Sequence, residues 1–507
     1  MLQLLSSAEY RKVNLIELLL KNKNKISVKQ IAEILHCSER IIDQDVVYIQ
    51  EHYSFINIHR HKGIITLNIK PEESPNKIYA TLLHQSTVFR LLELIFYDSN
   101  LHTEDLTEKL DISQATLYRH LSQLKGVLKE SFNLTLTTNP YQIRGKERSI
   151  RKFYVFFFSE KYLGLDWPEN MLTHSIIDTM IVTLRDQAKL LPQSINSHEL
   201  YAWIFVNITR SELGYLIPTD EYNALFLKKI SHYVHLEAFQ DMFVQLPKSL
   251  QALGNCKAIH QILYPYITEK TLFSHDDGVN QLNPTFDKER MLSVFELIHT
   301  LKNEFNIEID CLSDFALNLY NARHIYECIF NQSFIIYDNR RPFFDYFAEY
   351  FTEFNNRLEE LIHSSLFNGK HLSKCNLNNM KFIILSHWKD LTKQLMMADP
   401  LHIGFITNLS YAFIQFHKHY LENKLPRYCV IDIWKSYPLT SEAIANSPYD
   451  LIITNTVLPE NVTKPNVYIE NIYSPNEMAK VILTINEVKR KQVQGKGAEH
   501  RETITTD

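Results

Sequence analysis

Glycine, proline and closely spaced cysteine are scarce in this sequence of 507 residues, which holds 11 Gly, 17 Pro and 6 Cys. Turn-rich β architectures depend on Gly and Pro, so their scarcity favours helices. The cysteines include no C-x-x-C pair, and their scatter indicates neither a disulfide framework nor a structural zinc site. We therefore expect a mainly helical chain without a metal.

Long apolar runs and enzyme motifs are also missing. The most apolar stretch, 153–158, is far shorter than the ~20 residues that a membrane span needs. The first residues lack the basic segment that precedes the apolar run of a secretory signal. No Walker-type loop, G-x-G-x-x-G, H-E-x-x-H or G-x-S-x-G is present. We expect a cytoplasmic protein that contacts no membrane, is not an enzyme, and has neither catalytic residues nor a cofactor.

Length and charge suggest several domains with different roles. At one domain per ~100–200 residues, the chain predicts about three to five domains. The net charge of −5 hides an asymmetry, because residues 1–160 sum to +3 and the remainder to −8. The sign at the N-terminal end is the one that favours nucleic acid, although its size is modest.

An internal repeat dominates the N-terminal region. The segment IAEILHCSERIIDQDVVYIQ, from Ile31, matches LTEKLDISQATLYRHLSQLK, from Leu106, at an offset of 75 residues. Each copy has an apolar helix, a short break and a second apolar helix. The break holds His36 or Asp111, residue types that tolerate left-handed backbone, followed by Ser38 or Ser113 as the N-cap of the second helix.

A candidate β-hairpin follows each copy. The first, FINIHRHKGIITLNI, has Gly63 in its turn, and the second, LTLTTNPYQIRG, has Asn139-Pro140. A helix-turn-helix followed by such a hairpin is a winged helix. The sequence therefore predicts two winged helix-turn-helix units.

The second helix of each copy has an apolar and a polar face. We expect Ile42, Val46 and Ile49, and likewise Leu117, Leu121 and Leu124, to face the core. Gln and Arg can read base edges in the major groove, whereas Ser, Thr and Tyr typically hold phosphates. The candidate DNA-binding residues, with the basic hairpin turn included, are Ser38, Arg40, Gln44, Arg60, Lys62, Ser113, Gln114, Thr116, Tyr118 and Arg119.

Two features limit this assignment. The first copy's second helix carries three acids, Glu39, Asp43 and Asp45, which would repel phosphate, so the second copy is the better phosphate binder. The cluster Arg144, Lys146, Arg148, Arg151 and Lys152 after the second hairpin could add phosphate contacts or be a solvated helix face.

The rest of the chain changes pattern twice. A nearly all-helical region is interrupted at 275–284, and short apolar runs near 403–406, 428–433 and 451–454 then indicate a parallel sheet. We predict a winged helix-turn-helix at 1–70 and another with its connecting helix at 76–163. Helical domains follow at 170–275 and 285–395, then an α/β domain at 400–490 and a disordered polar tail at 491–507.

This order of parts resembles the Mga/AtxA-type virulence regulators of Gram-positive bacteria over nearly the whole chain. The motifs that carry the resemblance are HCSERIIDQDVVYIQEH and DISQATLYRHLSQLKGVL. It implies a transcription regulator that binds double-stranded DNA as a homodimer or higher oligomer. The bundles are then similar to phosphotransferase-system (PTS) regulation domains and the last domain to an enzyme IIB. PTS phosphocarrier proteins are implied partners, and His198, His324 and His387 are candidate phosphorylation sites.

The last domain departs from enzyme IIB proteins, which carry a phosphorylatable Cys in the loop after their first strand. Here that loop reads Thr407-Asn408-Leu409-Ser410, and Cys429 falls inside the next predicted strand. We therefore expect an assembly or docking module rather than a phosphocarrier.

Two other functions stay open. An RNA-binding antiterminator also carries PTS regulation domains, but such proteins begin with a small β-domain whereas this chain begins with helices. A PTS component acting as an enzyme is disfavoured by the missing loop cysteine.

Overall fold

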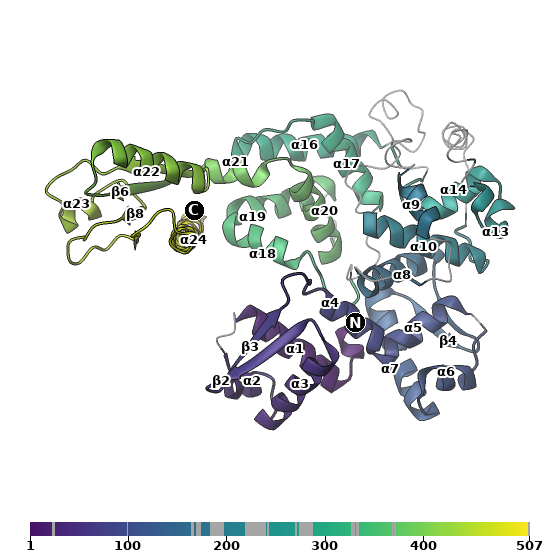
Figure 1. Ribbon diagram of the computed structural model, residues 1–507. Coiled ribbons are helices and arrows are strands. Elements are labelled where there is room, and N and C mark those ends of the chain that lie inside the picture. Colours follow the sequence, from purple (N-terminus) through teal and green to yellow (C-terminus); the bar gives the residue numbers. More distant parts are fainter. Residues whose placement is uncertain are drawn as a thin grey trace. The chain divides into compact units, whose positions relative to one another are not determined.

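Two helix-turn-helix segments, each followed by a β-hairpin, form the N-terminal part of the computed structural model (Figure 1). The structure describes residues 1–22, 26–98, 100–163, 167–168, 174–182, 197–218, 240, 243–268, 271–272, 287–325, 330, 334–367, 369 and 372–504. Contacts divide the chain into unit 1 (1–286, 321–339 and 373–376) and unit 2 (287–320, 340–372 and 377–507).

The first helix-turn-helix consists of α1 (Ser7–Lys21), β1 (Ile26–Ser27), α2 (Val28–Ile34), α3 (Glu39–His52), β2 (Ile56–His61) and β3 (Ile64–Ile69). Capping boxes start α1 at Ser6 and α2 at Ser27, where each Ser side chain accepts a backbone N–H and the residue three later bonds back. The strands form an antiparallel sheet in the order β1-β3-β2.

The first hairpin closes on a two-residue turn. His61 pairs with Ile64, and the residues between them, Lys62 and Gly63, have φ of 48° and 78°. Two successive left-handed residues match the twist of the flanking strands, and this is the conformation for which Gly is favoured. The predicted position of Gly63 in the turn is confirmed.

The second helix-turn-helix has two helices before it. The order is α4 (Lys77–Gln85), α5 (Thr87–Tyr97), α6 (Thr103–Leu110), α7 (Gln114–Phe132), β4 (Thr135–Thr138), β5 (Tyr141–Arg144) and α8 (Glu147–Lys161). Strands β4 and β5 pair as an antiparallel hairpin with Asn139 and Pro140 between them, as the sequence predicts.

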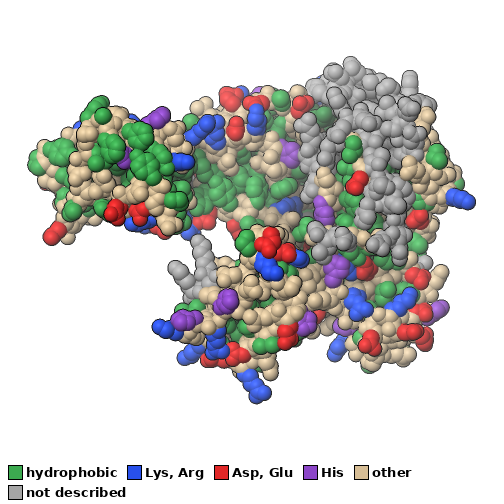
Figure 2. Space-filling model, in the orientation of Figure 1, with side chains coloured by type: hydrophobic (Ala, Val, Ile, Leu, Met, Phe, Trp, Pro, Cys, Tyr) green, Lys and Arg blue, Asp and Glu red, His purple; other side chains and the backbone are tan. Residues whose placement is uncertain are grey.

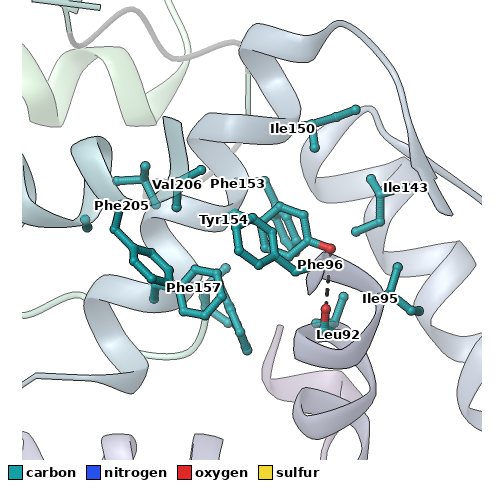
Figure 3. Packing of buried hydrophobic residues seen from close by; sticks show 14 of the residues in the cluster. Leu92, Ile95, Phe96, Ile143, Ile150, Phe153, Tyr154, Phe157, Phe205 and Val206 are labelled. Atoms are coloured by element: carbon teal, nitrogen blue, oxygen red, sulfur yellow. Dashed lines mark hydrogen bonds between the residues drawn. The ribbon is translucent and has the colours of Figure 1, made fainter. Parts of the chain in front are cut away.

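The apolar run of α8 lies in the core of unit 1. Phe153, Tyr154 and Phe157 pack in one cluster with Phe96 of α5 and with Phe205 of the later helix α10 (Ser197–Glu212), as Figure 3 shows. The Tyr154 hydroxyl donates to the carbonyl oxygen of Leu92 at 3.4 Å. A helix that is apolar on nearly all sides is buried in a globular core.

Among the described residues, no helix is long and apolar enough to cross a membrane.

Helices of unit 1 continue beyond α8. They are α9 (His174–Val182), α10 (Ser197–Glu212), α13 (Lys248–Gln251) and α14 (Asn255–Leu263). The interruption predicted at 275–284 lies outside the described residues.

The next helices belong mostly to unit 2. They are α16 (Lys288–Phe305), α17 (Leu312–Ile325), α18 (Arg341–Tyr350), α19 (Thr352–Leu361), the π-helical turn η3 (Ile362–Leu366), α20 (Lys374–His387) and α21 (Leu391–Met397). The division differs from the bundle that we expected at 285–395, because 321–339 and 373–376 group with unit 1. The half-buried carboxylate of Glu160 accepts the backbone N–H groups of Ile336 and Tyr337 at 2.9 and 3.3 Å. The Tyr337 ring stacks on Tyr79 at 4.1 Å between centroids.

The C-terminal region is α/β, as predicted. It contains β6 (Leu401–Ile406), α22 (Tyr411–Lys424), β7 (Cys429–Ile433), α23 (Ser441–Ala445), β8 (Leu451–Thr454), β9 (Asn466–Tyr468) and α24 (Pro475–Ile504). The four strands are all parallel, in the order β7-β6-β8-β9. The central strands β6 and β8 are buried along nearly their whole length, as in parallel sheets covered on both faces.

Two sequence-based expectations differ from this structure. The backbone of α24 is helical to Ile504, although we expected a disordered tail from 491. Its polar residues include Lys, Gln, Glu and Arg, which propagate a helix well, so polarity alone does not exclude one. Cys375 is disulfide-bonded, which the scattered cysteine spacing does not indicate.

Candidate nucleic-acid interface

The two recognition helices, α3 and α7, begin in the same way. The residues of the preceding turns, His36 and Asp111, have φ of 51° and 54°. The Ser38 hydroxyl accepts the N–H of Ile41 at 3.4 Å, and the Ser113 hydroxyl accepts that of Thr116 at 3.2 Å. The predicted left-handed turns and serine N-caps are therefore confirmed in both copies.

The inner faces of these helices carry the predicted apolar residues. Ile42, Ile49, Leu117, Leu121 and Leu124 are buried, and Val46 is half-buried. Burial at a spacing of three and four residues fixes which side of each helix faces solvent. That side is the one available to a major groove.

The outer faces hold most of the candidate DNA-binding residues. Ser38, Arg40, Gln44, Ser113, Gln114, Tyr118 and Arg119 are exposed. Thr116 is half-buried, and its hydroxyl bonds to that of Ser113 at 3.0 Å, so it belongs to the helix cap. Figure 2 shows basic and His side chains interspersed with acidic ones over the first helix-turn-helix (lower left).

Two of the four acids of α3, Asp45 and Asp43, form ion pairs, whereas Glu39 and Glu51 are exposed. Asp45 is only 3% exposed and forms an ion pair with Arg11 of α1, with Nε–Oδ2 at 2.6 Å. Asp43 pairs with Arg60 of the hairpin, with Nη1–Oδ1 at 2.8 Å. The expectation that three acids repel phosphate is therefore wrong for Asp45, and Asp43 is offset by a neighbouring cation. Glu39 lies at the start of the helix, where its negative charge interacts favourably with the helix dipole.

The hairpin of the first copy presents a basic edge. His59, Arg60, His61 and Lys62 are all exposed, and Lys62 lies in the turn itself. Because Arg60 bonds to Asp43, the hairpin is connected to the recognition helix. Such a hairpin can approach a phosphate or the minor groove next to the major groove that its helix occupies.

The basic cluster after the second hairpin divides into two parts. Arg144, Lys146 and Arg148 are exposed, whereas Arg151 and Lys152 are 0% and 8% exposed. The Arg151 guanidinium donates to the side chains of Glu147, Asn207, Ser211 and Gln261 and to the carbonyls of Tyr215 and Gln261. Neither phosphate binding nor a solvated face describes Arg151 or Lys152. Arg151 joins α8 to α10 and α14.

One exposed residue on α3 was missed by the sequence reasoning. Val47 is 52% exposed, on the same face as Arg40 and Gln44. The spacing 40, 44, 47 is that of one helical stripe, so a helical projection of α3 would have placed Val47 there.

Among the described residues, no group of three or more His, Cys, Asp or Glu side chains could hold a metal ion.

Comparison with known proteins identifies both N-terminal parts. Residues 7–62 match the model of the M protein trans-acting positive regulator (MGA) HTH domain, and residues 71–158 match the Mga helix-turn-helix domain. A protein of Streptococcus pneumoniae serotype 4 that is named a trans-acting regulator is 24% identical over 490 residues, covering 93% of this chain and 96% of its own length. These matches support the Mga/AtxA-type regulator family for this chain.

Two other relatives match over less of their length. The capsule synthesis positive regulator AcpB of Bacillus anthracis is 23% identical over 336 residues, covering 64% of this chain and 68% of AcpB. The capsule synthesis positive regulator AcpA of the same organism is 22% identical over 232 residues, covering 43% and 47%. All three relatives are named as regulators and none as an enzyme, in agreement with the expectation that this chain is no enzyme.

Proposed function

We propose that this Mga-type regulator acts on transcription by binding duplex promoter DNA through both helix-turn-helix domains. The observation that carries the proposal is the pair of capped recognition helices, each with a buried apolar face and an exposed polar one. Two such helices in one chain would contact two stretches of DNA. The RNA-binding alternative has no comparable support, whereas residues 7–62 and 71–158 both match helix-turn-helix family models.

The two helix-turn-helix copies would have different roles in DNA binding. In α3, Arg40 and Gln44 can bond to guanine and adenine edges. In α7, no acid occurs from Gln114 to Lys129, and Arg119 and Lys125 are exposed on that helix. We therefore assign base reading mainly to the first copy and phosphate binding mainly to the second.

Gel shifts with fragments test this proposal directly. Residues 1–160 should bind curved or AT-rich promoter duplexes, and residues 170–507 should not, at the same salt concentration. A hairpin RNA of equal length serves as the competitor that separates duplex-DNA binding from antitermination. The proposal fails if the N-terminal fragment binds duplex DNA no tighter than residues 170–507 do.

We propose in addition that the regulator self-associates through its C-terminal α/β domain, an enzyme-IIB-like module that serves assembly. Repeated or palindromic DNA sites call for more than one chain. Helix α22 exposes Tyr411, Phe413 and Phe416 by 74%, 49% and 57%. Figure 2 shows apolar side chains gathered on the surface of this domain (left). Cys429 is half-buried in β7, and burial raises the pKa of its thiol to about 12, which disfavours a phosphocarrier thiolate.

The regulatory part of the proposal is histidine phosphorylation in PTS-regulation-like bundles. In His387, Nδ1 donates to the carbonyl of Ile383 at 2.8 Å, which leaves the lone pair on Nε2, and burial lowers the pKa of the ring. In His198, Nε2 donates to the carbonyl of Ser159 at 2.9 Å. The side chain of His324 lies outside the described residues.

Phosphoryl transfer is tested by incubating the protein with the general PTS proteins and phosphoenolpyruvate. Mass spectrometry should find acid-labile phosphate on at least one of the three histidines, which would add about −1.5 to −2 charges by analogy with other phospho-residues. Absence of phosphate from all three would leave the bundles as structural parts or small-ligand sensors.

A further inference from the structure

The exposed stripe of α3 contains an apolar residue among polar ones. Arg40, Gln44 and Val47 lie along one side of the helix at intervals of four and three residues, opposite the buried Ile42 and Ile49. Val47 is 52% exposed. The core of the first helix-turn-helix, as described, includes its neighbour Val46 as a packed residue but not Val47.

Neither helix formation nor packing accounts for Val47. A β-branched residue at an exposed helical position is less favourable than Ala, Lys or Glu because its χ1 freedom is reduced. At the corresponding position of the repeat, 75 residues later, α7 has the exposed Ser122. The helix-turn-helix architecture therefore places no apolar requirement at this position.

The neighbours of Val47 define what it can contact. Residues three apart on a helix have Cβ atoms about 5–6 Å apart, so Val47 and Gln44 are neighbours on the surface that faces DNA. Gln bonds to the N6 and N7 atoms of adenine, and the thymine C5-methyl group is the apolar feature of the major groove. The ion pairs of Asp43 with Arg60 and of Asp45 with Arg11 leave Gln44 and Val47 as uncharged groups on this part of α3.

We infer that Val47 is a specificity residue that contacts a thymine methyl group in the base pair next to the one that Gln44 reads. This inference rests on the proposed function, since it assumes that α3 enters the major groove. It adds a preference for thymine at one position, and it assigns that preference to a van der Waals contact rather than to a hydrogen bond.

Replacing thymine by uracil removes only the methyl group and so isolates this contact. A duplex is first selected with the full-length protein from a randomised library, and each thymidine is then replaced in turn by deoxyuridine. We expect one replacement to weaken wild-type binding about fourfold, the value for burying one methyl-sized group. Val47→Ala should bind the thymine duplex about fourfold more weakly and should be insensitive to that replacement.

Three matched variants keep the test decisive. Ser122→Ala changes the corresponding residue of the second copy and should retain the wild-type sensitivity to uracil. Val47→Ile keeps an apolar side chain and should retain it too. Unfolding temperatures should be equal for all variants, because the side chains concerned are exposed.

The outcomes separate the inference from the function on which it rests. The inference is overturned if replacing thymine by uracil weakens wild-type binding at no position. It is also overturned if Val47→Ala still loses affinity on that replacement. If Arg40→Ala and Gln44→Ala also leave binding and sequence preference unchanged, the first copy does not read bases and the proposed function fails for α3. If those two variants alter preference while uracil has no effect, only the role of Val47 is refuted.

Discussion

Arg11 of α1 and Asp45 of α3 form a two-point ion pair, with Nε–Oδ2 at 2.6 Å and Nη2–Oδ1 at 3.1 Å. The next residue, Lys12, places its ammonium group 3.4 Å from the centroid of the Tyr48 ring, one helical turn beyond Asp45. Both contacts join α1 to the side of the recognition helix. They hold α3 in position while its other side stays exposed to solvent.

Breaking the buried pair should destabilise the first helix-turn-helix. The Asp45 side chain is 5% exposed. Arg11→Ala removes the cation that pairs with this carboxylate, which we expect to cost about 3 kcal/mol of unfolding free energy. Arg60→Ala breaks the exposed pair with Asp43 on the same helix and should cost about 0–1 kcal/mol. Hydrogen exchange of the amides in α1 and α3 measures both effects. Equal protection in the two variants would contradict the structural role of Arg11.

The exposed pair should instead affect DNA binding. Asp43→Asn removes a negative charge from the DNA-facing region and releases Arg60, so binding should tighten on all duplexes and the slope of log affinity against log salt should steepen by about one. Glu51→Gln makes the same charge change near the other end of α3 and is the control. If both variants change the slope equally, the release of Arg60 contributes nothing.

The two copies should respond differently to loss of their polar groups. Arg119→Ala should weaken binding to every sequence and reduce the salt slope, because we assign it to a phosphate. Gln44→Ala should change sequence preference, with about 1–3 kcal/mol for a lost base contact. Titration of both variants against a set of single-base variants of one duplex distinguishes these effects. Unchanged affinity and preference in both would show that DNA contacts another face.

Local patterns made the helix-turn-helix domains predictable from sequence. The turn residues, N-caps and apolar spacing of each copy lie within about twenty residues, so neighbouring residues determine them. The repeat strengthened the prediction because the same pattern occurs at Ile31 and at Leu106. The parallel strands of the C-terminal domain could also be predicted from sequence, because buried strands occur there as short apolar runs.

Charged residues were harder to place because their partners are distant in sequence. Asp45 and Arg11 are 34 residues apart, and Arg151 bonds to Asn207 and Ser211 at separations of 56 and 60 residues. A charged side chain is normally expected at the surface unless its partner is known. Sequence reasoning therefore assigned Asp45 and Arg151 to solvent, whereas the fold buries both.

Burial of His260 predicts acid sensitivity in unit 1. Desolvation and the nearby Arg148 and Arg151 lower the pKa of His260 from 6.5 to about 4. The unfolded chain therefore binds a proton between pH 6.5 and pH 4 that the folded chain does not, so stability falls as the pH falls through this window. The loss amounts to about 2 kcal/mol between pH 7.5 and pH 5.

The variant His260→Gln isolates this effect because it has no titrating group at the position. Its unfolding free energy should decline about 2 kcal/mol less than that of the wild type between pH 7.5 and pH 5. Denaturant unfolding at the two pH values provides the comparison, with His419→Gln, an exposed histidine in unit 2, as the control. Parallel pH dependence in wild type and His260→Gln would show that this histidine is not the source.

The aromatic face of α22 should govern self-association. A stable interface buries about 800 Å² per partner around a few aromatic anchors, and Phe413 and Phe416 are exposed large apolar residues one helical turn apart. Phe416→Glu places a charge where such an anchor would be desolvated, so the mass measured by light scattering should fall toward the 59.7 kDa of one chain. Deletion from residue 400 onward should have the same effect. Val457→Glu, at a residue that is 88% exposed elsewhere in the domain, should leave the mass unchanged. If Phe416→Glu retains the wild-type mass while the deletion lowers it, the chains associate through another face of this domain; if neither lowers it, they do not associate through the domain at all.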